Sequence, residues 1–364
     1  MGKHPKDLKF IAKARCQRAS CALALGVAFV ASHAAADSGS AAYGRGDFGA
    51  AAAQFMAQAQ HGDAVAQNNL GVLYLKGKGV PQNYAQARNW FEQAASQELP
   101  GAMFNLGIMH LRGYGMPVDA KEAVRWLDKA AEKGDREAQF FSGLQYYKGN
   151  GVARDFATAS KRFEAAAAQD LTAAQYNLAV MYLRGDGQPR NESLAVDWLT
   201  KAAQRKHEPS ALALSQIHLS HADDPAQAKL ALESFRQLAE SGNDEAQVAL
   251  GMMYTAGGGV KQDFEEGRFW LLQAANQGSH QAALDLGNLY AQGIGVDKDL
   301  SRAYAWYSIS AEAEDTIAKR NLEALRGKMN ADQLELAGRH IVDFKSHQRV
   351  IAGEKSPGSD KAAQ

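Results

Sequence analysis

The sequence predicts an all-α fold, an α-solenoid of stacked two-helix repeats that are 36 residues long. Three observations support this fold class. A short apolar motif recurs at a fixed spacing of 36 residues, each period holds two helical apolar patterns separated by a glycine turn, and only 8 prolines occur in 364 residues. A fixed period of this size is typical of solenoids, in which each repeat buries its apolar face against its neighbours.

The composition excludes several other classes of protein. The chain has 40 basic and 40 acidic residues, and this balance argues against a dedicated nucleic-acid binder. No apolar run reaches the roughly 18 residues that a membrane span needs. With 46% hydrophobic residues and 22% charged residues, the chain can build a folded core.

The first 36 residues are predicted to be a cleavable signal peptide. Six basic residues precede the apolar run at residues 21–31, and the small residues Ala34, Ala35 and Ala36 follow it. A disordered basic leader is the alternative. The signal peptide predicts a periplasmic or secreted protein. Because Cys16 and Cys21 both lie in this segment, the mature chain would have no disulfide, no thiolate metal site and no cysteine nucleophile.

The rest of the chain is predicted to follow the 36-residue period from end to end. Residues 37–63 match only the second half of a period, which makes them an N-terminal half repeat, and seven copies fill residues 64–315 without an insertion. Residues 316–350 are predicted to form a C-terminal half repeat and a capping helix, and residues 351–364 a disordered tail. The first-helix motif of the seven copies begins at Ala66, Ala102, Ala138, Ala174, Ser210, Ala246 and Ala282.

Each copy is predicted to contain two helices. The first helix is apolar at Ala66, Leu70, Leu73 and Tyr74, the spacing of one helical face. A G-x-G turn follows, in which glycine supplies the positive φ that a β-carbon disfavours. The second helix begins after a short polar residue that is suited to an N-cap, namely Asn83, Asp119, Asp155, Asn191, Asp263 or Asp299.

Two recurring features could be mistaken for ligand sites. All five tryptophans occupy one position of the repeat, and a position that is reused in a stack is expected to be packing core instead of an aromatic ligand box. The G-x-G turn lacks both a preceding strand and the lysine–serine pair of a phosphate loop, so we interpret it as a turn. The tryptophans are Trp90, Trp126, Trp198, Trp270 and Trp306.

With these residues the chain resembles the Sel1-like repeat family, which is related to the tetratricopeptide repeat. The family pattern A-x-x-x-L-G-x-x-Y-x-x-G-x-G-V-x-x-D-x-x-x-A-x-x-W-x-x-x-A-A-x-x-G is met closely at residues 66–98, 102–134 and 246–278, and the resemblance covers roughly residues 41–347. It implies a right-handed solenoid that acts as an adaptor for protein partners, often in the bacterial envelope or in secretion. Residues 329–344 are similar to the closing helix of such arrays, with Leu334, Ala337, Ile341 and Phe344 expected to cover the last repeat.

The fifth copy, residues 208–243, departs from the pattern. It has no G-x-G turn, it contains Pro209 and Pro225, and Ser234 replaces the tryptophan. We therefore expect a bend or weaker stacking at this copy. Two histidines three residues apart and a nearby carboxylate could hold zinc, although a polar turn that replaces the glycine turn is the preferred interpretation. The zinc candidates are His218, His221 and Asp223.

The sequence predicts a protein that is not an enzyme and needs no cofactor. The chain has no H-E-x-x-H, no G-x-S-x-G and no S-x-x-K in a suitable setting. One branch of the family that the chain resembles has disulfide-closed repeats and is linked to β-lactam binding and hydrolysis. This chain lacks those cysteines, so a β-lactamase-like activity is the least favoured alternative.

The predicted function is that of an exported scaffold in cell-envelope assembly or secretion, which binds a protein or peptide in its concave groove. Tetratricopeptide geometry, carried over by position, places the first helices along that groove, where amides can bond an extended backbone and aromatic rings can anchor a partner. Packing of the same aromatic residues between helices is the competing interpretation, and an envelope polysaccharide or peptidoglycan factor is the alternative function. The groove candidates are Asn68, Asn69, Phe104, Asn105, Phe140, Tyr176 and Asn177.

A column of cations completes the predicted binding site. Lys76, Arg112, Lys148 and Arg184 recur at one position, and the later copies have no cation there. Residues 64–207 hold 18 basic and 14 acidic residues, whereas residues 208–315 hold 6 basic and 16 acidic residues. An acidic or C-terminal peptide segment is the expected ligand of the column, and head-to-tail self-association is the second candidate. Complementing the helix dipole is the simpler explanation of the column.

Overall fold

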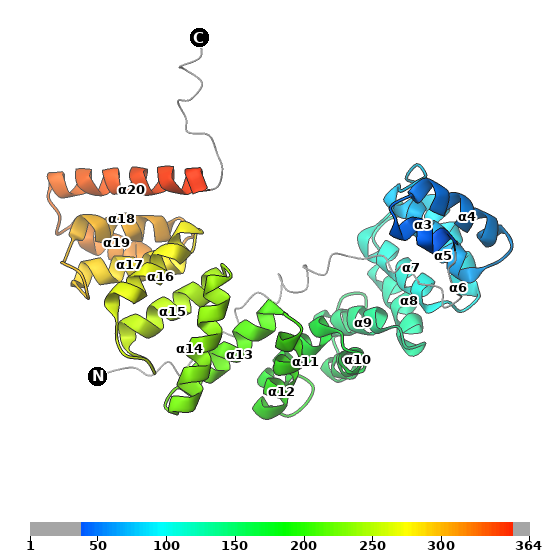
Figure 1. Cartoon of the computed structure of the whole chain (residues 1–364), viewed down its shortest axis with the longest axis horizontal. Helices are drawn as coiled ribbons and strands as arrows, with labels where there is room; N and C mark the ends of the chain where they lie inside the picture. The colour runs from blue at the N-terminus through cyan, green and yellow to red at the C-terminus, as the bar shows by residue number, and fades with distance from the viewer. Residues whose placement is uncertain (1–37, 352–364) are drawn as a thin grey trace, which may run out of the picture. The chain divides into compact units, whose positions relative to one another are not determined.

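The computed structural model describes residues 38–351, which form eighteen helices and no strand (Figure 1). The all-α prediction is therefore confirmed for this part of the chain. No helix within it combines the length and apolar character that a membrane span requires. The predicted signal peptide and residues 352–364 of the predicted tail lie outside the described residues.

The helices follow the predicted order of a half repeat, seven two-helix copies and a C-terminal cap, with consecutive helices packed against each other. The half repeat comprises α3 (Ser38–Gly44) and α4 (Phe48–Gln60). Copies one to four comprise α5 (Ala64–Lys76), α6 (Tyr84–Ser96), α7 (Pro100–Arg112), α8 (Ala120–Glu132), α9 (Arg136–Lys148), α10 (Phe156–Ala168), α11 (Thr172–Arg184) and α12 (Glu192–Gln204). Copies five to seven comprise α13 (Glu208–Ser220), α14 (Pro225–Glu240), α15 (Asp244–Ala256), α16 (Phe264–Asn276), α17 (His280–Gln292) and α18 (Leu300–Ala311), and the cap comprises α19 (Thr316–Arg326) and α20 (Ala331–Ile351).

The described chain divides into two compact units, residues 38–210 and residues 211–351. The division lies within α13, the first helix of the irregular fifth copy. That copy also differs locally, because four residues join its two helices and α14 starts directly after them, with Asp224 as N-cap and Pro225 in the first turn. Proline fits there because its missing N–H is not needed in the first turn. Weaker stacking at this copy stays a prediction.

Every predicted N-cap of a second helix is confirmed. Asp119, for example, accepts a hydrogen bond at 2.9 Å from the backbone N–H of Glu122. The first glycine of the turn caps the first helix in the left-handed conformation, as Gly113 does with a φ of 68°. Both ends of the turn are thus set by local chemistry that the sequence displays.

The second glycine of the turn has a further role, which depends on the preceding copy. Gly151 has a φ of 77°, and a β-carbon at this position would lie 2.2 Å from the carbonyl oxygen of Ala120, at the start of α8. Only glycine allows the turn of one copy to approach the second helix of the copy before it so closely. The G-x-G motif therefore sets the contact between successive copies as well as the turn.

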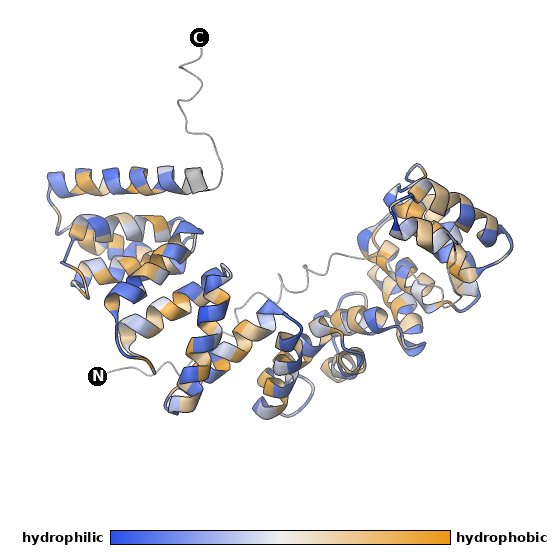
Figure 2. Ribbon diagram, viewed as in Figure 1, coloured by the Kyte–Doolittle hydropathy of each residue, from blue (hydrophilic) through white to orange (hydrophobic). Residues whose placement is uncertain are grey.

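The core of each copy centres on the residue that follows the tryptophan position. Phe91, Leu127 and Phe163 are fully buried, and Leu271 is buried in the same way. Trp126 is only half-buried, and the cations of Arg125 and Lys129 lie over its ring. Trp270 is buried, with 9% of its surface exposed, and the other four tryptophans are half-buried. The tryptophans therefore pack at the edge of the core instead of filling its centre. Figure 2 shows hydrophobic and hydrophilic residues sharing each second helix, as this one-sided packing requires.

The predicted closing helix is present. Ala337 of α20 is fully buried, and the ring of Phe344 lies 4.7 Å from that of Trp306 in α18. Leu334 and Ile341 are half-buried. α20 runs on to Ile351. The helix covers the apolar surface that the last copy would otherwise expose.

Candidate functional site

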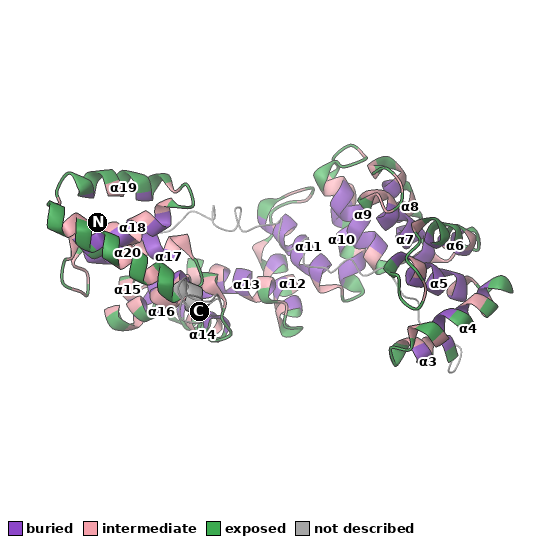
Figure 3. Ribbon diagram, turned by 90° about the horizontal axis from the view of Figure 1, so that it is seen from above, coloured by how far each residue is buried: buried purple, intermediate pink, exposed green. Residues whose placement is uncertain are grey.

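The seven groove candidates are buried. They lie on α5, α7, α9 and α11, which Figure 3 shows as buried over most of their length. Their exposed fractions fall between 0% and 8%. The prediction that these aromatic and amide side chains line an open groove is therefore wrong for this structure. They are Asn68, Asn69, Phe104, Asn105, Phe140, Tyr176 and Asn177.

These side chains connect the first helices of successive copies. The amide of Asn105 in α7 donates to the side-chain oxygen of Asn68 in α5 at 2.8 Å. The ring of Phe104 in α7 lies 5.6 Å from that of Phe141 in α9. The competing interpretation, packing between helices, is therefore the one that the structure shows. We call the positions that Asn68, Asn69 and Val72 occupy in α5, and their equivalents in other first helices, the stacking stripe.

The four cations of the column are exposed. Lys76, Arg112, Lys148 and Arg184 are the last residues of α5, α7, α9 and α11, so they lie at the same end of four successive first helices. Partial burial and the nearby charge of Lys78 lower the pKa of Lys76. The structure thus separates the predicted site into an accessible cation column and an inaccessible stacking stripe.

One member of the column belongs to a small polar network. Arg184 donates to the hydroxyl of Tyr147 at 2.9 Å, and this hydroxyl donates to a carboxylate oxygen of Asp186 at 3.0 Å. Burial is the main cause that raises the pKa of Tyr147. The network joins copies three and four at the end of the helices where the column lies, and it fixes the direction of Arg184.

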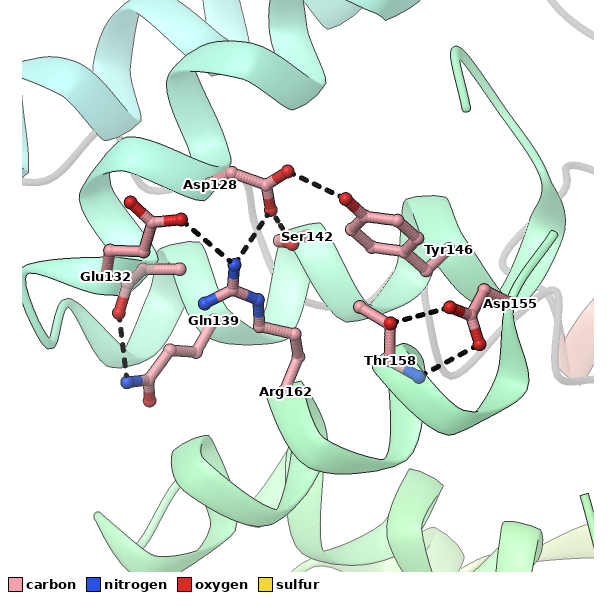
Figure 4. Close-up of polar contacts among 9 residues, drawn as sticks. Asp128, Glu132, Gln139, Ser142, Tyr146, Asp155, Thr158 and Arg162 are labelled. Carbon is pink, nitrogen blue, oxygen red and sulfur yellow. Dashed lines mark hydrogen bonds and ion pairs between the residues drawn. The ribbon is translucent and has the colours of Figure 1, made fainter. Parts of the chain in front are cut away.

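A half-buried polar cluster, missed by sequence reasoning, links copies two and three (Figure 4). Asp128 of α8 accepts hydrogen bonds from Ser142 at 2.6 Å and from Tyr146 at 2.9 Å, and it pairs with Arg162 at 3.3 Å. Glu132 lies 3.7 Å from the same guanidinium. Burial, followed by the hydrogen bond to Asp128, raises the pKa of Tyr146.

The sequence did contain a signal for this cluster. In copy three, Ser142 replaces the leucine of the L-G pair and Arg162 replaces the tryptophan. Two apolar positions thus become polar together, and the carboxylate of Asp128 satisfies both. Because Arg162 is already paired with two carboxylates, the cluster is suited to holding two copies together and not to binding an anion.

Removing Asp128 is expected to destabilise the protein. Asp128→Ala leaves Arg162, Ser142 and Tyr146 without their common acceptor, and the expected loss is ~2 kcal/mol of unfolding free energy, since the side chains of Asp128 and Arg162 are 21% and 22% exposed. Glu132→Ala, which removes only a long and exposed ion pair, is the control and should cost less than about 0.5 kcal/mol. Urea unfolding followed by circular dichroism measures both, and equal effects would contradict the role given to Asp128.

The zinc candidates do not come together. His218 shares a hydrogen bond of 2.7 Å with Gln227, and His221 contacts the backbone oxygen of Ile217 at 2.9 Å. Across residues 38–351 no three metal-ligating side chains form a group. The polar-turn interpretation fits these contacts, since both histidines bond to groups of the fifth copy.

A cavity of about 780 Å³ lies beside α18 and α20, in the unit formed by residues 211–351. Its lining mixes charges of both signs, including Asp297, Lys298 and Asp299. Arg302 pairs with Asp299 at 3.4 Å and lies over the ring of Tyr290. The lining holds three cations, Arg268, Lys298 and Arg302, against two carboxylates, so its charges largely offset one another and give little preference for an ion of either sign.

The comparisons with known proteins agree with this architecture. The model of the Sel1 repeat matches residues 64–99, 100–135, 136–171, 172–207, 244–279 and 280–315, and it leaves out the irregular fifth copy. No curated protein matches the sequence significantly.

Two solved structures are similar over most of the chain. A Sel1 repeat protein from Oxalobacter formigenes is 31% identical, with a TM-score of 0.59 over 79% of this chain and 86% of that one. A protective antigen of uropathogenic Escherichia coli with an SLR fold is 24% identical, with a TM-score of 0.53 over 88% of this chain and 78% of that one.

Proposed function

The chain belongs to the Sel1 repeat family, and we propose that it is an exported, non-catalytic scaffold that holds an acidic protein or peptide partner in cell-envelope assembly or secretion. Sel1 repeats are typically a fold for protein–protein interaction. Residues 38–210 offer a stack of helices in which cationic side chains recur at a fixed spacing. Such a surface suits an extended partner that meets the same contact several times.

The exposed cation column is the observation that carries this proposal. Its four side chains lie at the ends of α5, α7, α9 and α11, and the equivalent positions later in the chain are Ser220, Ala256 and Gln292. A helix dipole alone would favour a cation at the end of every first helix. The column instead ends where the excess of basic residues in 64–207 gives way to an excess of acidic residues in 208–315.

Export is part of the proposal because of the sequence that precedes the repeats. A basic segment, a short apolar run and Ala34–Ala36 have the order of a secretory signal peptide. The two cysteines of the chain lie within this segment, so the repeats contain no thiol to protect or oxidise. A periplasmic or extracellular scaffold fits both features.

The polysaccharide-binding alternative loses its main support. It required aromatic rings on an open surface, whereas Phe104 and Phe140 are each 1% exposed. Head-to-tail association of two copies of the chain remains the second candidate, because residues 64–207 and 208–315 carry net charges of opposite sign. Unlike ends favour heterologous contacts.

Reversing two cations of the column tests the proposal. The double substitution Arg112→Glu and Lys148→Glu is expected to weaken partner capture at least about tenfold at low salt, because it removes the net positive charge of the column without touching the core. The effect should shrink as salt rises, since the screening length falls from about 30 Å at 0.01 M to about 3 Å at 1 M. Crosslinking in cells followed by mass spectrometry identifies the captured protein, and binding of that purified protein gives the affinity.

The control makes the same change of charge elsewhere in the same unit. Lys121 and Lys161 are exposed residues of α8 and α10, outside the column. Their reversal to glutamate should leave capture within about twofold. If capture by the column variant persists at every salt concentration, the four cations only cap their helices and the proposed site is wrong.

A further inference from the structure

The stacking stripe is closed in α5, α7, α9 and α11 and open in α15 and α17, while in α13 Leu212 and Ala213 are still buried. In α5, α7, α9 and α11 all twelve of its side chains are buried. In α15 and α17 only Leu284 is buried at these positions, and Met252 is 50% exposed. The half-buried members there are Val248, Ala249, Asp285 and Asn288.

Side-chain volume explains the difference. The first position of the stripe holds Phe104, Phe140 or Tyr176 in α7, α9 and α11, and these rings fill the space between successive first helices. In α5 it holds Asn68, which is buried and accepts a hydrogen bond from Asn105. In α15 the same position holds Val248, which packs against the apolar cluster that includes Leu286 but does not fill the space. Ala249 follows it where the closed copies have an amide or a ring. The smaller residues leave Met252 without cover.

Asp285 is the charged group in the open part of the stripe. The amide of Gln281 donates to its carboxylate at 3.2 Å, and no ion pair to it occurs among residues 38–351. Burial raises the pKa of Asp285 to about 6. An ion pair with a cationic partner stabilises such a carboxylate more than it stabilises a fully solvated carboxylate, because the hydration of the buried group is already reduced.

The polar groups that lie next to Asp285 in α17 and face it from α18 and α19 are neutral. The hydroxyl of Tyr307 in α18 donates to the side-chain oxygen of Asn288 at 2.8 Å, and Asn321 of α19 also hydrogen-bonds to Tyr307. α16 contributes only apolar buried residues to the hydrophobic cluster that contains Leu286, namely Leu271, Ala274 and Ala275. Arg320, which holds the first stripe position in α19, is exposed and causes no shift in the pKa of Asp285.

We propose that the open stripe of α15 and α17 is a second docking surface, which takes a basic segment of a protein partner with a lysine or arginine on Asp285 and an apolar side chain on Met252. The inference rests on the proposed scaffold function. Charge complementarity favours this occupant, because residues 208–315 hold 16 acidic and 6 basic residues. Met252 adds a flexible apolar contact that adapts to the shape of its partner.

A pair of peptides tests the proposal. One is a short acetylated peptide of leucine and alanine with a central arginine, and the other carries citrulline, which has the same shape but no charge. Calorimetry with the full mature chain at pH 7.5 is expected to show at least about tenfold tighter binding of the arginine peptide. At pH 4.5, where Asp285 is protonated, the ratio of the two affinities should approach one.

Three variants assign the effect. Asp285→Asn should bring the ratio to one at both pH values, whereas Asp297→Asn, an exposed carboxylate in the turn after α17, should leave it unchanged. Met252→Ser should weaken both peptides alike. A ratio near one at pH 7.5, an unchanged ratio in Asp285→Asn, or no binding of either peptide would overturn the proposal.

The result is separable from the test of the cation column. The protein with Arg112→Glu and Lys148→Glu should keep the full preference for the arginine peptide, since neither residue belongs to the unit formed by residues 211–351. Loss of partner capture in that variant together with an intact preference for arginine would support two independent surfaces. Loss of the preference in that variant would contradict the assignment to Asp285.

Discussion

Gly151→Ala is expected to cost ~3 kcal/mol or more of unfolding free energy. Gly151 has a φ of 77°, which strains any residue with a β-carbon, and the new carbon would lie 2.2 Å from the oxygen and 2.3 Å from the carbon of the Ala120 carbonyl. Backbone of this kind cannot move aside as a flexible side chain can, so α8 and the turn of copy three must separate. Urea unfolding monitored by circular dichroism measures the loss.

The control for this prediction shares the strained conformation but not the contact. Gly134 has a φ of 89°, and a β-carbon there meets nothing within 4 Å. Gly134→Ala should therefore cost only ~1–2 kcal/mol, the price of the conformation alone. The equivalent positions in copies one and three hold Glu98 and Asp170 with φ values of 62° and 63°, which shows that the fold accepts a side chain there. Equal losses for the two alanine variants would contradict the role of close approach.

Asp285→Asn is expected to stabilise the ligand-free protein at neutral pH by ~2 kcal/mol. Folding raises the pKa of this carboxyl from 3.8 to about 6. The folded state therefore binds the proton more tightly than the unfolded state does. The contribution of the protonated carboxyl to stability is complete below pH 3.8 and is lost as the pH rises to about 6. This change corresponds to ~3 kcal/mol, which partial contact with solvent reduces to ~2 kcal/mol.

The difference between Asp285→Asn and the parent protein should thus grow between pH 4 and pH 6.5 and vanish below about pH 4. Unfolding free energies measured in urea across this range check the prediction. Asp297→Asn removes an exposed carboxylate from the same copy and should show no such trend. A constant difference between Asp285→Asn and the parent at all pH values would mean that Asp285 does not titrate in this window.

The sequence by itself determined the helices, their ends and the number of copies. These features depend on interactions within one copy, such as the cap that Asp119 forms with the N–H of Glu122 and the left-handed glycine at residue 113. Such interactions join residues only a few positions apart, so the spacing of residue types displays them directly. The 36-residue period then repeats the same local solution along the chain.

Contacts between copies were decided by the tertiary structure alone. Helical periodicity shows that Phe104 and Met252 face the same way, but the volumes of the neighbouring side chains decide that the first is 1% and the second 50% exposed. Asp128 meets Ser142 and Arg162 only because copies two and three stack, at sequence separations of 14 and 34 residues. The exposure of a side chain depends on how tightly neighbouring copies pack. The residues of a single copy do not determine the spacing between two copies by themselves.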